Sequence, residues 1–225
     1  MVKPMSQLLR LRIELPDRPG ALAHVASVLG RRGGNVASVD IHELEGESAV
    51  DEIVVEVNDD WEPAALADDL AAAGASLLSA EPERELRDPI VSALGWSSAL
   101  LAARAHECDL ELGRAVMELT SAAAAWVCPV SEAVAYGAGR LALERGAPVV
   151  QRTDDPIPGA NGLPSSVWLL AVPDGYLGAE LVAFAARPLA VRFTSSEIAR
   201  VEALLMLRRQ LAGLRFPAPT RTDGW

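Results

Sequence analysis

The first thirty residues of the predicted fold switch between two hydrophobic periods. From Leu9 to Leu15 every second residue is apolar and the residues between them are charged, the pattern of a strand with one buried face. From Leu22 to Leu29 the apolar residues recur at intervals of three and four, which describes one face of a helix. The segment Asp17–Leu22 joins the two, so the pattern predicts a strand, a turn and a helix.

Proline and glycine mark the ends of this helix. Pro19 suits the first helical turn because its fixed φ angle matches the helix. Gly33 and Gly34 are expected to end it, and Asn35 is a residue type that tolerates a left-handed turn. We therefore predict a helix whose first turn contains Pro19 and which stops at the glycine pair.

Segments with the apolar spacing of a strand and segments with that of a helix follow one another as far as residue 80. A second strand is predicted at Asn35–Glu45, with Val36, Ser38 and Asp40 on one side and Val39 and Ile41 on the other. The remaining elements are a third strand at Ala49–Val57, a helix from Pro63 to Gly74 with Leu66 and Leu70 inward, and a fourth strand at Ser76–Ala80. The order is βαββαβ.

The turn at Asp17–Leu22 contains groups that could bind a small ligand. A helix start leaves the backbone N–H groups of Gly20, Ala21 and Leu22 without helical partners, and such groups attract anions. Asp17 beside them suits an ammonium group, and the amide of Asn35 both donates and accepts. This set suits a zwitterion such as a free amino acid. The alternative is that Asp17 only stabilises the helix dipole and Asn35 only makes a turn.

These residues resemble the ACT domain, a small ligand-binding module of amino-acid metabolism. The resemblance runs through the Asp17–Leu22 turn, then Val25, Leu29, the glycine pair and Asn35-Val36, and covers about residues 6–82. It implies a ferredoxin-like sheet with two helices on one face, the second strand at a sheet edge, pairing with another copy, and an amino acid at the interface. The ligand contacts that it implies are Asp17, Arg18, Pro19, Gly20, Ala21, Leu22, Asn35 and Val36.

The second half of the chain follows a charged joint at Glu81–Glu85. Residues 89–125 are predicted as two helices, or as one long helix with a weak point near Gly113. The later elements are a strand at Trp126–Val130, a helix from the cap Ser131 to Gly146, a strand at Pro148–Thr153, and a buried hairpin of Val167–Val172 with Leu177–Ala186. A capping box, Thr194 with Glu197, opens a last helix that reaches Gly213.

This second half resembles a GAF-like sensory domain through the run Val167–Pro173, the hairpin after it, and Phe193-Thr194 with Glu197. The prediction is therefore an α+β chain of three parts. These are an ACT-like regulatory domain at 1–84, a second α/β GAF-like domain at 88–214, and a flexible tail at 215–225.

The charge and composition of the sequence limit the kinds of partner that we expect the protein to bind. The net charge of −11 in 225 residues argues against nucleic acid, and the sequence has no long charge-free apolar run to cross a membrane. Cys108 and Cys128 are the two cysteines and lack C-x-x-C spacing, and residues 1–4 lead directly into a strand without a secretory segment. The prediction is a cytoplasmic protein that uses no nucleic acid and no membrane.

No motif for catalysis stands out. The sequence lacks G-x-S-x-G, H-E-x-x-H, Walker and G-x-G-x-x-G motifs, and its three histidines are scattered. We predict no catalytic residues, no metal site and no cofactor. The predicted function is a non-catalytic regulatory homodimer that senses a free amino acid, with any protein partner left open. The alternatives are a small amino-acid-pathway enzyme with catalysis in the second half under ACT control, and a purely structural dimerisation protein.

Overall fold

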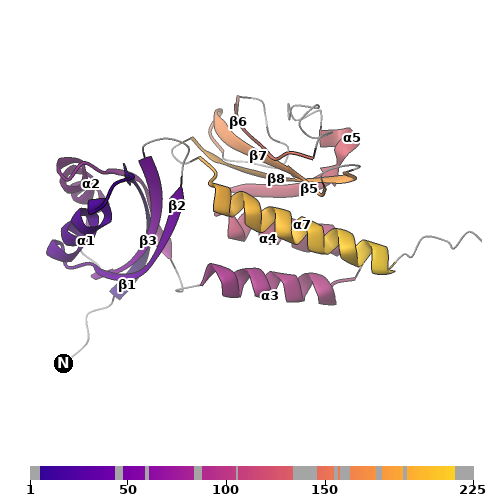
Figure 1. Ribbon diagram of the computed structural model, residues 1–225, viewed down its shortest axis with the longest axis horizontal. Coiled ribbons are helices and arrows are strands. Elements are labelled where there is room, and N and C mark those ends of the chain that lie inside the picture. Colours follow the sequence, from indigo (N-terminus) through magenta and orange to yellow (C-terminus); the bar gives the residue numbers. More distant parts are fainter. Residues whose placement is uncertain are drawn as a thin grey trace, which may run out of the picture. The chain divides into compact units, whose positions relative to one another are not determined.

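The chain forms two compact units, Met1–Arg87 and Asp88–Trp225. The computed structural model describes residues 6–43, 48–58, 61–83, 88–104, 106–133, 146–154, 157, 163–175, 179–189 and 192–215. The end of the predicted strand Asn35–Glu45 at residues 44–45, most of the helix predicted after Ser131, and residues 84–87 and 216–225 lie outside this part. Each unit is a four-stranded antiparallel sheet with helices packed on it (Figure 1).

The first unit confirms the predicted βαββαβ order. Its elements are β1 (Ser6–Pro16), α1 (Ala21–Arg31), β2 (Asn35–Glu43), β3 (Ser48–Asn58), α2 (Pro63–Ala72) and β4 (Ser76–Glu83). The sheet order is β2-β3-β1-β4, which places β2 at an edge as expected, with both helices on one face (Figure 1). Strand β4 is three residues longer than predicted, so part of the predicted joint belongs to the sheet.

Apolar and charged side chains alternate along β1 and point to opposite faces of this sheet. Leu11 and Ile13 of β1 are fully buried in a core with Val55 of β3 and with residues of both helices, including the predicted Leu66 and Leu70. The opposite face is charged, and there Arg10 and Arg12 both pair with Glu52, at 3.2 and 2.9 Å. Hydrophobic burial on the helix side holds the unit together.

A turn sets the start of α1. The amide of Ala21 donates to the carbonyl of Arg18 at 3.2 Å, and Gly20 has φ 89° and ψ −10°. This is a type II turn with Pro19 at its second position and glycine at the third, where φ must be positive. Pro19 therefore precedes the helix and does not occupy its first turn, because the turn needs the fixed φ of proline one residue earlier.

The predicted ends of both helices are confirmed, but Asn35 does not take part in the turn that ends the first one. Gly33 has φ 79°, and the amides of Gly33 and Gly34 donate to the carbonyls of Gly30 and Leu29, both at 3.0 Å, which is a Schellman motif. The end of α2 at Gly74 repeats this geometry, with Ala75 donating to Leu70 at 2.9 Å. Asn35 is not left-handed: it is the first residue of β2, because Gly33 already supplies the turn.

Strand β2 carries a bulge that the alternation did not predict. The pairing with β3 shifts between Val36 and Ser38, so Ala37 is the extra residue. Val36 consequently lies opposite Val55 and on the same side as Val39 and Ile41, not on the side of Ser38. All three apolar side chains are exposed, at 37, 40 and 58%.

The second unit has its own sheet, of order β5-β8-β7-β6. Its described elements are α3 (Pro89–Ala102), α4 (Cys108–Leu119), β5 (Ala124–Pro129), α5 (Val130–Ala133), β6 (Val149–Thr153), β7 (Val167–Pro173), β8 (Leu181–Pro188) and α7 (Ser195–Arg215). Helices α4 and α7 share a core with one face of the sheet, and α3 packs on these two helices. The other face holds a second cluster centred on Phe184, which stacks on Trp126.

The prediction of two helices in residues 89–125 is confirmed, because α3 ends at Ala102 and α4 begins at Cys108, without a glycine or proline between them. The alternative of one long helix with a weak point near Gly113 is wrong, since Gly113 lies inside α4. Three further bounds differ from the prediction. Helix α5 begins at Val130, so Ser131 is not its cap. Strand β8 begins at Leu181, and Arg215 ends α7 instead of starting the tail.

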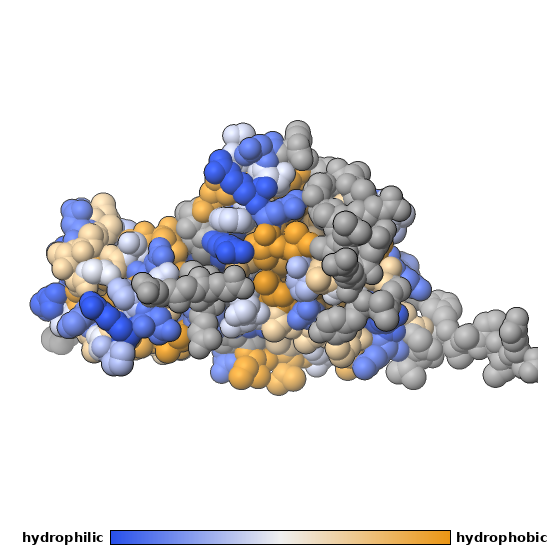
Figure 2. Space-filling view, turned by 45° about the horizontal axis from the view of Figure 1, so that its top comes forward, coloured by the Kyte–Doolittle hydropathy of each residue, from blue (hydrophilic) through white to orange (hydrophobic). Residues whose placement is uncertain are grey.

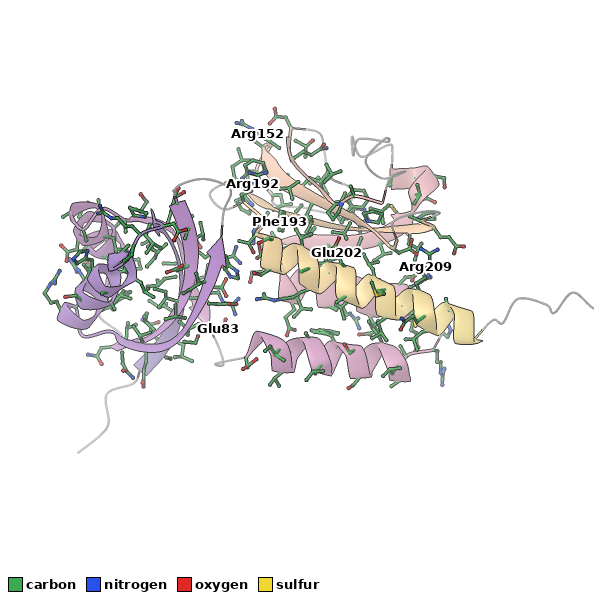
Figure 3. The ribbon with its side chains drawn as sticks, viewed as in Figure 1. Glu83, Arg152, Arg192, Phe193, Glu202 and Arg209 are labelled. Atoms are coloured by element: carbon green, nitrogen blue, oxygen red, sulfur yellow. The ribbon has the colours of Figure 1, made fainter. Side chains whose placement is uncertain are left out.

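The capping box at the start of α7 is confirmed. The amide of Thr194 donates to the Glu197 carboxylate at 2.8 Å, and the amide of Glu197 donates to the Thr194 hydroxyl at 3.3 Å. The same carboxylate accepts two hydrogen bonds from Arg187 of β8, both at 2.8 Å. Phe193, labelled at the start of α7 in Figure 3, lies 4.0 Å under the Arg187 guanidinium. This buried pair ties α7 to the sheet.

Ser121, which follows α4, occupies a left-handed position that glycine takes at the ends of α1 and α2. It follows α4 at φ 47°, where its amide donates to Glu118 and that of Ala122 to Met117, so a serine occupies the glycine position of a Schellman motif. Because a left-handed side chain is strained, we expect Ser121→Gly to raise the free energy of unfolding by about 0.5–1 kcal/mol. Urea unfolding measures this, and Ser121→Ala is the control that should give no gain.

Candidate functional site

The candidate site begins with the turn before α1. Asp17, Arg18, Pro19 and Gly20 are all exposed. A Cβ added at Gly20 would meet no atom within 4 Å, so the space above the turn is open. Within the described residues, the amides of Gly20 and Leu22 have no hydrogen-bond acceptor, whereas that of Ala21 already donates within the turn. Two of the three predicted amides are therefore open to an anion.

Asn35 and Val36 do not join this turn within one copy of the chain. Asn35 pairs with Glu56, and Glu56 pairs with Leu8, near the start of β1. The turn follows Pro16, eight residues further along β1, which at about 3.4 Å per residue places it ~27 Å away. A single amino acid is far shorter than this, so the two halves of the predicted site can meet only between two copies.

Asp51 is a residue of this region that the sequence analysis missed. It lies in β3 between Ile13 and Ile41, is 2% exposed, and one of its carboxylate oxygens has no hydrogen-bond partner. Burial raises the pKa of its carboxyl group, His42 opposes that rise and Asp17 adds to it. The signal was present, since Asp51 continues the inward series of positions 53, 55 and 57. An acidic environment therefore lies beside the turn, which suits a cationic group.

The raised pKa of Asp51 gives a testable pH dependence. A carboxyl whose pKa is higher in the folded state stabilises the fold below its ordinary value of 3.8 and loses that contribution as the pH rises through the folded-state value. Asp51→Asn cannot ionise. We therefore expect its stability relative to the unaltered protein to increase from about pH 4 to about pH 7. Urea titrations at the two pH values measure this, with the exposed Asp68→Asn as control; a constant difference would contradict it.

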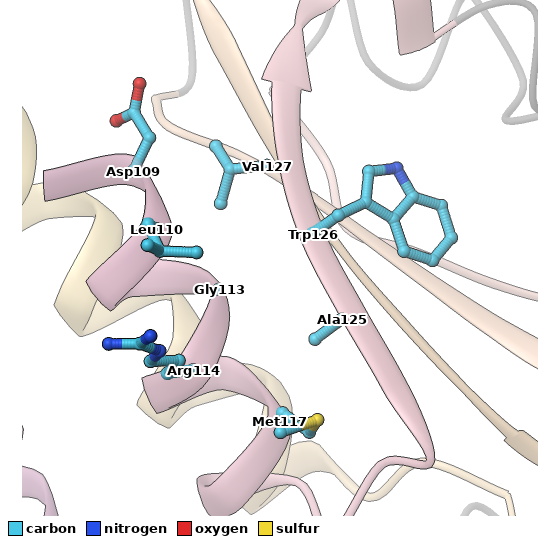
Figure 4. A pocket seen from close by; sticks show the side chains of 8 residues that line it. All are labelled: Asp109, Leu110, Gly113, Arg114, Met117, Ala125, Trp126 and Val127. Carbon is cyan, nitrogen blue, oxygen red and sulfur yellow. The ribbon is translucent and has the colours of Figure 1, made fainter. Parts of the chain in front are cut away.

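The described part of the second unit contains a shallow groove beside its sheet. This groove of about 290 Å³ lies between α4 and the edge strand β5 (Figure 4). It is lined by Asp109, Leu110, Gly113, Arg114, Met117, Ala125, Trp126 and Val127. Its two charged side chains, Asp109 and Arg114, lie on exposed turns of α4, and no serine, cysteine or histidine is among the residues that line it.

The described residues give no sign of a metal centre, a membrane span or a reactive thiol. Among them, no group of three or more His, Cys, Asp or Glu side chains is placed to hold a metal ion. No helix in the same part of the chain is long and apolar enough to cross a membrane. Cys108 and Cys128 are both buried and do not form a disulfide. Burial, with a smaller contribution from the Glu132 carboxylate, raises the pKa of the Cys128 thiol to about 11, which makes it a weak nucleophile.

Comparison with known families agrees with the first unit. The sequence model of the ACT domain matches residues 9–80, which run from β1 to β4 and include the open turn and β2. The N-terminal unit is an ACT domain. ACT domains are regulatory modules that bind small ligands and often dimerise, so regulatory binding of a small ligand is the coarse function of this unit. The GAF-like resemblance of the second unit stays a prediction.

Solved structures add little beyond this match. One is an uncharacterized protein of Thermotoga maritima, 20% identical, covering 36% of this chain and 100% of its own, with a TM-score of 0.28. Two others are an unknown protein of Galdieria sulphuraria (12% identity, 93 and 95% coverage) and a formyltetrahydrofolate deformylase of Pseudomonas putida (13% identity, 91 and 93% coverage), each with a TM-score of 0.32. Scores this low carry no argument about this chain. No curated protein matches it.

Proposed function

We propose that this protein is a non-catalytic regulator that binds a free amino acid where the ACT domains of two copies meet. The observation that carries the proposal is the open turn at Gly20. Its two unengaged amides suit a carboxylate, and the acidic side chains of Asp17 and Asp51 suit an ammonium group. A free amino acid carries both groups.

The edge strand β2 supports pairing of two copies. Val36, Val39 and Ile41 expose an apolar row on the helix side of the sheet edge. Beside it, the exposed residues of α1 are mostly small: Ala23, Ala26, Ser27 and Gly30. An uncovered edge strand tends to pair, and small helix residues permit close approach.

Antiparallel pairing of β2 with the same strand of a second copy would complete the site. A two-fold axis at Val39 sets the partner subunit's Asn35 opposite Glu43, because the two positions are equally far from the axis. Glu43 pairs with Ala49, which pairs with Leu15 next to the turn. The turn of one copy and the partner subunit's Asn35 would then face the same ligand, giving two equal sites per dimer.

Pairing through β2 can be tested without ligand. Val39→Asp would place two carboxylates against each other at the axis of a chain that already carries a net charge of −11. We expect at least a tenfold weaker dimer in sedimentation, about 1.4 kcal/mol. Val39→Thr, which keeps the shape and strand preference, should leave the dimer unchanged. A monomeric unaltered protein at micromolar concentration would contradict the pairing.

The rival functions predict other results. A purely structural dimeriser would keep the dimer and bind no amino acid. An enzyme with catalysis in the second unit would turn over an amino-acid-pathway substrate, and its rate would change with the ligand of the ACT domain. The buried, high-pKa thiol and a groove that no serine, cysteine or histidine lines support the regulator over the enzyme.

A further inference from the structure

Asp51 is a buried acid at a position where the pattern of its strand favours an apolar residue. Positions 53, 55 and 57 of β3 are apolar and buried in the core below the helices. Asp51 continues this series, with Ile13 of β1 and Ile41 of β2 as its neighbours across the strands. Hydrophilic residues are spread over the surface of the first unit in Figure 2, but Asp51 is 2% exposed and one of its carboxylate oxygens has no hydrogen-bond partner. Such an atom lowers the stability of the fold, so a ligand that pairs with it gains affinity.

Asp51 and Asp17 form an acidic pair that no arginine neutralises among the described residues. Other acids of this unit have such a partner; Asp69, for example, lies 2.7 Å from Arg32. Neither Asp51 nor Asp17 forms an ion pair of this kind with a described residue. Burial raises the pKa of Asp51, His42 offsets only part of that rise and Asp17 adds to it, so the two carboxyl groups are near each other. Two cations are therefore needed to neutralise this corner of the unit.

The positions of the two acids give them different distances from the open turn. Asp17 directly follows β1 and belongs to the turn itself. Asp51 lies opposite Ile13, three residues before β1 ends at Pro16, so about 10 Å of strand separates it from the turn. A ligand carboxylate on the open amides brings its α-ammonium group close to Asp17 but not to Asp51. Only a cation at the end of a long side chain reaches the second acid.

Asp51 also lies one strand away from the edge at which two copies would pair. Strand β2 forms that edge (Figure 1), and its Ile41, which is opposite Asp51, is 58% exposed. The apolar side chains of Ile41 and Ile13 on either side suit the carbon stem of a lysine or arginine side chain. Pairing of the two edges would exclude water from this corner, and an ion pair is stronger where water is excluded.

We propose that Asp51 selects a basic amino acid, lysine or arginine, by pairing with the cation at the end of the ligand's side chain. This rests on the proposed function, because the ligand's carboxylate and α-ammonium groups keep the places assigned to them there. A basic amino acid neutralises both acids, whereas a neutral one leaves Asp51 buried without a counter-charge. The net charge of −11 acts in the same direction, since it attracts a cationic ligand.

Calorimetry on the full chain tests this selection with pairs of ligands that differ in one charge. Citrulline has nearly the shape of arginine without its charge, and norleucine is lysine without its terminal ammonium group. We expect arginine or lysine to bind at least tenfold more tightly than its neutral counterpart. Both members of a pair carry the same α-carboxylate and α-ammonium groups, so the ratio of their affinities reports the side-chain cation alone.

Two variants of Asp51 and one control assign the ratio to this residue. Asp51→Asn should bring the two affinities of a pair to within about twofold of each other. Asp51→Val should do the same while raising the melting temperature, because valine extends the apolar series of β3, so the lost preference does not come from unfolding. Asp40→Asn is the matched control: it removes a carboxylate from β2 on the face without helices, where Asp40 pairs with Glu52, and should keep the preference.

The outcomes separate this inference from the function on which it rests. If a neutral amino acid binds as tightly as its basic counterpart, or if Asp51→Asn and Asp51→Val keep the preference, Asp51 does not select the ligand and amino-acid sensing stands. If no amino acid binds, the proposed function itself is wrong. A preference that Asp40→Asn removes as well would show a general effect of charge and would also overturn the role of Asp51.

Discussion

Arg187→Met is expected to lower the free energy of unfolding by about 3–5 kcal/mol. Arg187 is 3% exposed, and Glu197, whose two carboxylate oxygens it contacts, is 2% exposed. The same guanidinium donates to the carbonyls of Thr120 and Arg192, at 2.8 and 2.6 Å. Removing it would leave a buried carboxylate without its counter-charge and two carbonyls without a donor, at the point where α4, β8 and α7 meet.

A double-variant cycle separates the pair from general damage to the core. Arg187→Met combined with Glu197→Gln should recover part of the loss, because no unpaired charge then remains. Arg208→Met is the matched control, since Arg208 pairs at 3.1 Å with the half-exposed Asp109 and should cost no more than about 1 kcal/mol. Urea unfolding measures the unaltered protein, the two single variants, the double variant and the Arg208→Met control. Equal losses for Arg187→Met and Arg208→Met would show that the buried pair does not hold α7.

Mixed dimers are expected to restore amino-acid binding that each parent variant has lost. Asp17→Lys changes the exposed turn and Asn35→Ala changes the start of β2, ~27 Å from that turn in one copy. A hydrogen bond to a charged group contributes about 1.5–3 kcal/mol, so losing the Asn35 amide should weaken binding about ten- to a hundredfold. Reversing the charge of Asp17 should repel the ammonium group and weaken binding at least as much.

The mixed dimer has one site with both changes and one with neither, because each site takes its turn and its Asn35 from different copies. Co-expression with two affinity tags and purification on both isolates this species. Calorimetry should find one site per dimer with the affinity of the unaltered protein. If a mixed dimer of verified composition binds no better than its parents, the ligand does not bridge the two copies.

Short-range signals predicted much of the fold. The alternation in β1 and the spacing in α1 are direct results of which side chains face the core, and Gly33 and Gly74 end helices because they adopt positive φ angles. Thr194 and Glu197 formed the expected capping box, since both partners lie three residues apart in the sequence. Each of these features depends on neighbours within one or two turns of chain.

Features that depend on distant partners were missed. The position of the break between α3 and α4 is not marked by proline or glycine in the sequence, and residues of both helices join one core with α7. The Arg187–Glu197 pair joins a strand to a helix, and neither residue predicts the other. The separation of Asn35 from the turn follows from the strand register, which the ligand pattern does not contain. Asp51 could have been found, as a charged residue in an inward series.

Calorimetric titration of the unaltered full chain with each of the twenty amino acids, repeated with Asn35→Ala, tests the central claim most directly. We expect at least one amino acid to release or absorb heat with saturation at millimolar concentration or below. At about 100 times the dissociation constant it should also add about 2.7 kcal/mol of stability, visible as a higher melting temperature. Both effects should be strongly reduced in Asn35→Ala. If no amino acid gives heat or a melting shift while the protein remains dimeric, the ACT domain is a structural dimeriser and the proposed sensing function is wrong.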